Sequence, residues 1–292
     1  MGTQTGRVRL AGVSNHGGYP PGVPCWIDVA EPDPTAAAAF YADLFGWSFE
    51  DHRSETPDAA YRVARLAGRA VAAIGPAPAA GAAPAWMTYI GVASADETAA
   101  AVRAAGGTVV TEPYDVPDEG RTAGCADPAG APFGLWQPGR MTGAELVNAP
   151  GTWNWSDLHT PDVDAARAFY GAVFGWEAAE VELGPGPPEW MWRRPGYADF
   201  LEATRDPGIR ARHAAIGAPE GFSDAVGWLV PAQGPASWKV TFAVDDTDGV
   251  ARRAAAGGGT VVQEPFAAGP VRLAELTDPW GASLTVSHYA PG

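Results

Sequence analysis

Residues 153–176 read WNWSDLHTPDVDAARAFYGAVFGW, and this stretch predicts a strand that leads directly into a helix. In a strand the side chains alternate between two faces, so Trp155, Asp157 and His159 project together from one of them. A tryptophan, an acid and a histidine in one row suit the lining of a pocket better than a core. The same passage occurs earlier in the chain, without the histidine.

Residues 24–47 read PCWIDVAEPDPTAAAAFYADLFGW, where the row holds Trp26, Asp28 and an alanine. The two passages align without a gap at an offset of 129 (155 − 26), and 12 of 24 positions are identical. Three further pairs repeat downstream: WMTYIGV with WKVTFAV, GGTVVTEP with GGTVVQEP, and DPAGAPFGL with DPWGASLTV. Repeats of this length indicate a duplicated domain.

The repeats predict one domain at 22–138 and a second at 151–290. A linker at 139–150 joins them, and the Gly-bearing segment 1–21 is expected to be a flexible leader. The two copies differ most between 177 and 236, where the second copy carries extra aromatic and arginine residues.

Composition and charge narrow the class of protein. The chain has 292 residues, 46% of them hydrophobic, which is ample for well-packed cores. A net charge of −15 argues against nucleic acid and anionic membranes as partners. There is no apolar segment of the kind that a secretory signal or a membrane span needs. The two cysteines give no disulfide or zinc spacing, so we expect a cytoplasmic protein. We also expect it to be a monomer or a homodimer.

Each copy begins with a strand and a capped helix. Asp33 and Asp162 are the expected N-cap residues of the first helix in each copy, and Gly46 is expected to end this helix in the first copy. The strand residues Ile27 and Val29 would pack under this helix, because they alternate with the Trp–Asp row. The Trp–Asp row therefore points away from the helix, into whatever the sheet encloses.

The order strand–Asp–helix–FY..LFGW, then strand–Asp–helix–GG, then DP.G, resembles the vicinal oxygen chelate superfamily of glyoxalases, bleomycin-resistance proteins and extradiol dioxygenases. The stretch VNAPGTWNWSDLHTPD (146–161) is similar to the second domain of two-domain actinobacterial members labelled glyoxalase-like or hydroxylase. The resemblance implies an α+β fold of four βαβββ modules in two glyoxalase-like domains. Their sheets would form cup-shaped, partly open barrels with helices outside and ligands on the concave faces.

Metal enzymes of this superfamily bind a divalent ion through His, Gln or Glu on the inner strands. The resemblance places unsuitable side chains at six of these positions: Trp26, Trp155, Met87, Lys239, Gly134 and Thr285. The remaining ligand position lies near residues 70–74 in one copy and near 212–216 in the other, where only His213 is available. We therefore expect no resident metal and no cofactor.

The second copy is chemically the richer one, and we expect it to carry the function. The candidate catalytic residues are His159, Asp157 and Lys239. The candidate ligand-binding residues are Trp155, Trp26, Asp28, Tyr89, Met87, Thr241, Trp136 and Thr285. The row at 155–159 would face Lys239 and Thr241 if each cup closes within one repeat, or Met87 and Tyr89 if it closes between repeats. The two aspartates would otherwise tie down loop amides, a purely structural role.

Three functions remain open at this point. The first is a metal-independent tailoring enzyme of specialised metabolism, a lyase, isomerase or cyclase using acid–base chemistry on a small planar or aromatic metabolite. The second is a binding protein that sequesters such a metabolite, as bleomycin-resistance proteins do. The third is a divalent-metal lyase or oxygenase with rearranged ligands, such as His159, Asp157 and His213.

Overall fold

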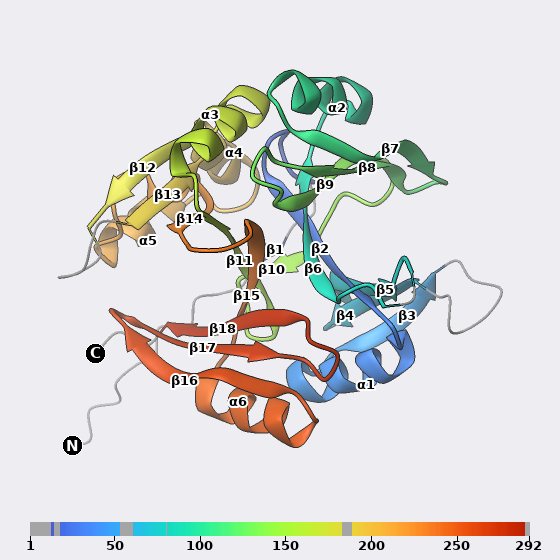
Figure 1. Ribbon diagram of the computed structural model, residues 1–292. Helices are drawn as coiled ribbons and strands as arrows, with labels where there is room; N and C mark the ends of the chain where they lie inside the picture. The colour runs from blue at the N-terminus through green and yellow to red at the C-terminus, as the bar shows by residue number, and fades with distance from the viewer. Residues whose placement is uncertain (1–12, 15–17, 53–60, 80, 183–188, 290–292) are drawn as a thin grey trace, which may run out of the picture.

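The chain folds into two eight-stranded mixed sheets, each curled into an open cup (Figure 1). The computed structural model describes residues 13–14, 18–52, 61–79, 81–182 and 189–289. Neither sheet closes into a barrel, because each has two free edge strands. The two cups open toward opposite sides of the molecule, and the helices lie on the outer faces of the sheets (Figure 1).

The first sheet has the strand order β3-β4-β5-β2-β6-β9-β8-β7. It comprises two βαβββ modules with the following elements: β2 (Pro24–Glu31), α1 (Pro34–Phe45), β3 (Ser48–His52), β4 (Tyr61–Leu66), β5 (Arg69–Pro76), β6 (Ala85–Gly91), α2 (Ala95–Ala104), β7 (Thr108–Val116), β8 (Gly120–Ala126) and β9 (Pro132–Pro138).

The second sheet repeats this order as β12-β13-β14-β11-β15-β18-β17-β16. An insertion of two helices and a 3₁₀ turn between β13 and β14 distinguishes it from the first. Its elements are β11 (Thr152–Thr160), α3 (Val163–Phe174), β12 (Glu177–Val181), β13 (Glu189–Arg193), α4 (Tyr197–Thr204), α5 (Ile209–Ala215), η2 (Phe222–Asp224), β14 (Ala225–Pro231), β15 (Ser237–Ala243), α6 (Thr247–Ala256), β16 (Thr260–Ala268), β17 (Val271–Thr277) and β18 (Ser283–Tyr289).

Each cup closes within one repeat. Strand β11 pairs with β15 of its own domain, placing Trp155 opposite Thr241 and Asp157 opposite Lys239. The first domain follows the same register, with β2 against β6. The question that the sequence left open is thereby answered, and no cup mixes strands from the two repeats.

The first helix of each domain begins and ends where its caps predict. The side chain of Asp33 accepts hydrogen bonds from the backbone N–H groups of residues 35 and 36, and Pro34 is the first helical residue. Asp162 caps α3 in the same way. Gly46 and Gly175 end the helices with φ of 75° and 68°, a conformation that glycine adopts without strain.

The helix-facing cores are shared between the domains. Helix α1 packs beside α6, and α2 beside α3 (Figure 1). Tyr41 donates to Asp278 at 2.9 Å, and its counterpart Tyr170 donates to Asp127 at 3.3 Å. The two helix-end indoles also cross the interface, from Trp47 to the carbonyl of Gly151 and from Trp176 to the carbonyl of Gly22. These reciprocal contacts relate the domains by an approximate twofold.

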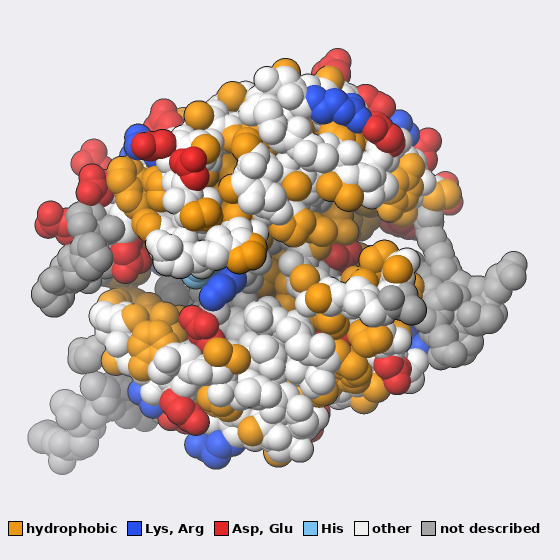
Figure 2. Space-filling model, viewed as in Figure 1, with side chains coloured by type: hydrophobic (Ala, Val, Ile, Leu, Met, Phe, Trp, Pro, Cys, Tyr) orange, Lys and Arg blue, Asp and Glu red, His pale blue; other side chains and the backbone are white. Residues whose placement is uncertain are grey.

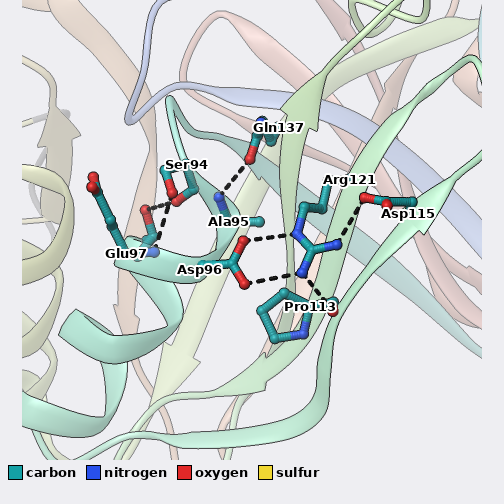
Figure 3. Close-up of polar contacts among 9 residues, drawn as sticks. Ser94, Ala95, Asp96, Glu97, Pro113, Asp115, Arg121 and Gln137 are labelled. Atoms are coloured by element: carbon teal, nitrogen blue, oxygen red, sulfur yellow. Dashed lines mark hydrogen bonds and ion pairs between the residues drawn. The ribbon is translucent and has the colours of Figure 1, made fainter.

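Polar contacts also tie α2 to the edge of the first sheet. The guanidinium of Arg121 on β8 donates to both oxygens of Asp96 on α2 and to Asp115 on β7 (Figure 3). The N-terminus of the same helix is held by the side chains of Ser94 and Gln137 (Figure 3). Exposed ion pairs contribute little stability, so we read this network as fixing the orientation of α2 on the sheet.

The leader and the linker are joined by a short strand pair. Strand β1 (Val13–Ser14) pairs antiparallel with β10 (Leu146–Val147). Tyr19 donates to the carbonyl of Ala144 at 3.0 Å. Residues 13–14 and 19 of the predicted flexible leader therefore contact the linker, while residues 1–12 and 15–17 lie outside the described part of the chain. Within the described ranges, no helix is long and apolar enough to span a membrane.

Candidate functional site

The concave face of the first cup carries a closed network of hydroxyl groups around one carboxylate. Tyr61 and Tyr89 both donate to Oδ2 of Asp28, at 2.9 and 3.0 Å. The indole of Trp26 donates to the Tyr61 hydroxyl at 3.0 Å and is only 2% exposed. Burial raises the pKa of Asp28 to about 6, and the two phenols partly oppose this effect. The network fixes this aspartate firmly in place.

The second cup has the same aspartate with different neighbours. Strand pairing shows that Tyr61 and Glu189 occupy equivalent positions, as do Tyr89 and Thr241. Both phenols are therefore missing. Asp157 accepts one hydrogen bond from Thr241 at 3.3 Å, through Oδ2. Its other oxygen, Oδ1, is buried and takes no hydrogen bond from any described residue.

Asp157 is poised to exchange a proton near neutral pH. Burial raises its pKa from 3.8 to about 7, and the nearby charge of Glu189 adds to the rise. Thr241, the backbone N–H of Trp228 and Lys239 act in the opposite direction without cancelling the effect of burial. A carboxyl group with a pKa near 7 and one buried oxygen that lacks a hydrogen-bond partner is suited to general acid–base chemistry.

His159 lies on the same face of β11 but is not hydrogen-bonded to Asp157 within the described structure. Burial lowers its pKa to about 4, and the positive charge of Lys239 contributes. The ring is therefore neutral at physiological pH. The neutral ring can donate or accept a hydrogen bond. Of these two side chains, it is Asp157 and not His159 that gains and loses a proton near neutral pH.

Lys239 is already engaged by an acid. Its Nζ lies 3.7 Å from Oε2 of Glu275 on β17. Glu275 pairs across the sheet with Thr285 on β18. A hollow of about 40 Å³ lies against these three residues, with Val262 at its rim. This is room for a few waters, so a planar ligand would occupy the open cup above it. In the space-filling view the molecule is hollowed between the halves formed by β12–β14 and β16–β18, with charged and histidine side chains inside (Figure 2).

The upper wall of the second cup is aromatic. The ring of Trp155 lies 5.8 Å from that of Phe222 and 6.3 Å from that of Trp228. Phe222 comes from the insertion and covers the cup from the α5 side. Sequence reasoning missed Phe222, Trp228, Glu189 and Glu275, although Trp228 and Glu275 stand in the alternating patterns of β14 and β17.

His213 is not on an inner strand, as the comparison of residues 212–216 with 70–74 suggested. It lies on helix α5, where Nδ1 contacts the Ser223 hydroxyl at 2.9 Å and the ring packs on Phe222. The true counterpart of β5 is β14, because both pair parallel with the first strand of their domain. The insertion shifted the alignment and produced the error.

Two other candidates have rings that pack against neighbouring parts of the first domain. Trp136 is 7% exposed and donates its indole N–H to the carbonyl of Met141, so it packs into the core. Tyr89 is half-buried and its ring fills the space above Gly134, where an added Cβ would lie 2.1 Å from the ring. Met87 is half-buried opposite Asp28, one residue pair away from Tyr89.

The inner strands do not fit the divalent metal that the superfamily's enzymes use. The rows crossing the sheets run Trp26–Tyr89–Gly134 and Trp155–Thr241–Thr285. Tyr89 and Thr241, rather than Met87 and Lys239, therefore lie directly across from the indoles. Among the described residues, no three His, Cys, Asp or Glu side chains gather closely enough to hold a metal ion. The alternative metal ligands considered from the sequence, His159, Asp157 and His213, are therefore not gathered into a metal site either.

Duplicated βαβββ modules whose sheets curl into open cups are the architecture of the vicinal oxygen chelate class. Residues 26–136 match the model of the glyoxalase-like domain. Residues 153–286 match the model of the glyoxalase/bleomycin resistance protein/dioxygenase superfamily. The chain belongs to this superfamily.

Two curated relatives are similar over nearly the whole chain. One is "Putative glyoxylase CFP32" of Mycobacterium bovis, 38% identical over 94% of this chain and 97% of the relative. Another is "Anthracycline biosynthesis protein DnrV" of Streptomyces peucetius, 34% identical over 94% of this chain and 96% of the relative.

Solved structures share the fold at low identity. The Mn(II)-bound glyoxalase from Novosphingobium aromaticivorans is 17% identical, with a TM-score of 0.58 over 96% of this chain and 83% of that chain. The 2,3-dioxygenase LapB from Pseudomonas sp. KL28 is 11% identical, with a TM-score of 0.58 over 92% of this chain and 93% of that one.

Proposed function

We propose that the second cup binds a small planar metabolite of specialised metabolism and moves a proton on it without a metal ion. The observation that carries this proposal is Asp157, whose pKa is about 7 and whose buried Oδ1 has no partner among the described residues. A role in specialised metabolism is supported by the similarity to DnrV, an anthracycline biosynthesis protein. The aromatic wall of Trp155, Trp228 and Phe222 is suited to a flat ligand.

The proposed step is an enolisation. Asp157, as the carboxylate, takes a proton from a carbon next to a ketone, and the electron pair moves to the ketone oxygen. Lys239 supplies positive charge on the same face, and neutral His159 offers a hydrogen bond. Asp157 then returns the proton to another carbon or oxygen of the same molecule. The sequence is an isomerisation and needs no oxidant.

Proton exchange tests this proposal before the product is known. We would incubate the protein with a panel of planar hydroxylated ketones in D₂O and follow deuterium uptake by mass spectrometry. Asp157→Asn should lower the exchange rate by at least 100-fold and leave ligand affinity within about tenfold. The matched control is Asp245→Asn, since Asp245 is exposed at the end of β15. The wild-type rate should rise with pH through about 7, the pKa of Asp157.

A binding protein is the second candidate, because the aromatic wall alone suffices to hold a flat ligand. In that case Trp155→Phe would weaken binding, and no member of the panel would gain deuterium above the rate of the ketone alone. Exchange at an equal rate in wild type and Asp157→Asn would reject the catalytic proposal.

A further inference from the structure

We propose that the first cup is a second ligand site, separate from the proposed catalytic cup, and that it takes an organic cation such as an amine. Asp28 is the residue that defines this site, which is independent of the proposed function of the second cup. Equivalent positions of the two cups differ in a consistent direction: polar and charged groups of the second cup are replaced by phenols, small residues and a thioether in the first.

The first cup holds a carboxylate without a counter-ion. In the second cup the pair Lys239–Glu275 lies beside Asp157. The corresponding positions in the first cup are Met87 and Gly124. The pKa of Asp28 responds to burial and to two phenols, and no cation of the described residues contributes to it. With a pKa of about 6 this group is mostly ionised at neutral pH, in a setting where an unpaired charge is costly.

The geometry leaves one side of this carboxylate for a ligand. Both phenol hydrogen bonds go to Oδ2, and no described residue donates to Oδ1. Since a carboxylate oxygen only accepts, the complementary group is a donor, and a charged N–H gains the attraction of the negative charge as well. Tyr61 and Tyr89 add ring faces beside the carboxylate, which favours an organic cation further.

Part of this site reaches the molecular surface. Asp28, Tyr61, Tyr89 and Met87 are half-buried, and Tyr114 on the edge strand β7 is 52% exposed. The phenol of Tyr114 acts on the pKa of Tyr61 and Tyr89, so it lies near them on the concave side.

Two small residues also stand on the inner face of this cup. Ala30 stands where the second cup has His159, and Ala73 where it has Trp228. This cup opens on the side of the molecule opposite to the second (Figure 1).

Two acridines of opposite charge test the proposal by isothermal titration calorimetry at pH 8. One is 9-aminoacridine, a planar cation, and the other is acridine-9-carboxylate, a planar anion. Wild type should bind the cation and not the anion. Asp28→Asn should weaken cation binding at least tenfold. Met87→Lys, which introduces the base found in the second cup, should weaken it equally while Asp28 and its phenols stay in place. Affinity in wild type should fall as pH is lowered through about 6, because Asp28 is then protonated.

Three outcomes would overturn the proposal. The first is no binding of 9-aminoacridine by wild type. The second is equal binding by wild type, Asp28→Asn and Met87→Lys. The third is loss of binding in Asp157→Asn with binding retained in Met87→Lys, which would place the cation in the second cup. None of these results bears on proton exchange at Asp157, so this proposal and the proposed function fail independently.

Discussion

Two aspartates at equivalent positions acquire different chemistry from their neighbours. Asp28 is fixed by two phenols, whereas Asp157 has one hydroxyl partner and an acid, Glu189, nearby. Burial raises the pKa of both aspartates, but of the two only Asp157 has a fully buried oxygen without a hydrogen-bond partner among the described residues. Single side chains on neighbouring strands therefore set the hydrogen bonding and the pKa of the aspartate at this position.

The raised pKa of Asp157 makes folding stability depend on pH. The folded state holds the proton more tightly than the unfolded state, so this contribution is full below pH about 4 and is lost as pH rises through about 7. Asp157→Asn removes the cost of ionisation. It should raise the free energy of unfolding at pH 8 by on the order of 1–3 kcal/mol and have little effect at pH 4. Denaturant unfolding at both pH values measures the difference, and equal effects at both would contradict the assignment.

The alternation of side chains predicted which residues share the concave face, and the structure places Trp155, Asp157 and His159 together as expected. The sequence could not predict the cross-strand neighbours. Glu189 reaches Asp157 only because β13 pairs with β14, which in turn pairs with β11. The sign of the His159 shift also depended on burial, which a strand pattern alone does not give.

At the scale of elements, the insertion between β13 and β14 is what makes the second cup different. Its helices α4 and α5 have no counterpart in the first domain, and η2 brings Phe222 against Trp155. The sequence indicated that residues 177–236 differ between the copies. It did not indicate that this segment packs over the cup, because that contact joins residues far apart in the chain.

Phe222→Ala should uncover Trp155. Loss of the ring contact at 5.8 Å should increase acrylamide quenching of Trp155 fluorescence and cost about 1–2 kcal/mol of stability, less than for a fully buried ring. Comparing the substitution in wild-type and Trp155→Phe backgrounds isolates this one indole. Phe266→Ala is the control, since Phe266 is an exposed ring on the edge strand β16. Quenching that does not change in the wild-type background would show that η2 does not cover the cup.

At the scale of the molecule, the sheets belong to separate repeats while the helix-facing cores do not. The two largest hydrophobic clusters each contain residues from both domains. Duplication and the strand–helix order were evident from the sequence, so the fold class was predictable. The shared cores could not be predicted, because the amino-acid pattern of each repeat is the same whether its helices pack on their own domain or against the other one.

One buried acid at this shared interface gives the last prediction. Glu31 is completely buried, and neither carboxylate oxygen has a hydrogen-bond partner among the described residues. Burial raises its pKa, and the neighbouring Asp278 carboxyl group raises it further, by favouring the protonated acid as a hydrogen-bonding neighbour and through its negative charge. Thr160 occupies the equivalent position in the second domain, 129 residues later (160 − 31). The first domain alone therefore places an acid here.

A raised carboxyl pKa stabilises the folded state below the unfolded value of about 4.5, and this stability is lost as pH rises. Glu31→Gln keeps the shape and cannot ionise, so its melting temperature should exceed that of wild type by an amount that grows from pH 5 to pH 9. We expect a gain of about 2 kcal/mol at the upper end. Glu264→Gln, at an exposed position on β16, is the control for a general effect of charge. A difference that is constant over this pH range, or that the control reproduces, would mean that Glu31 does not ionise within the interface.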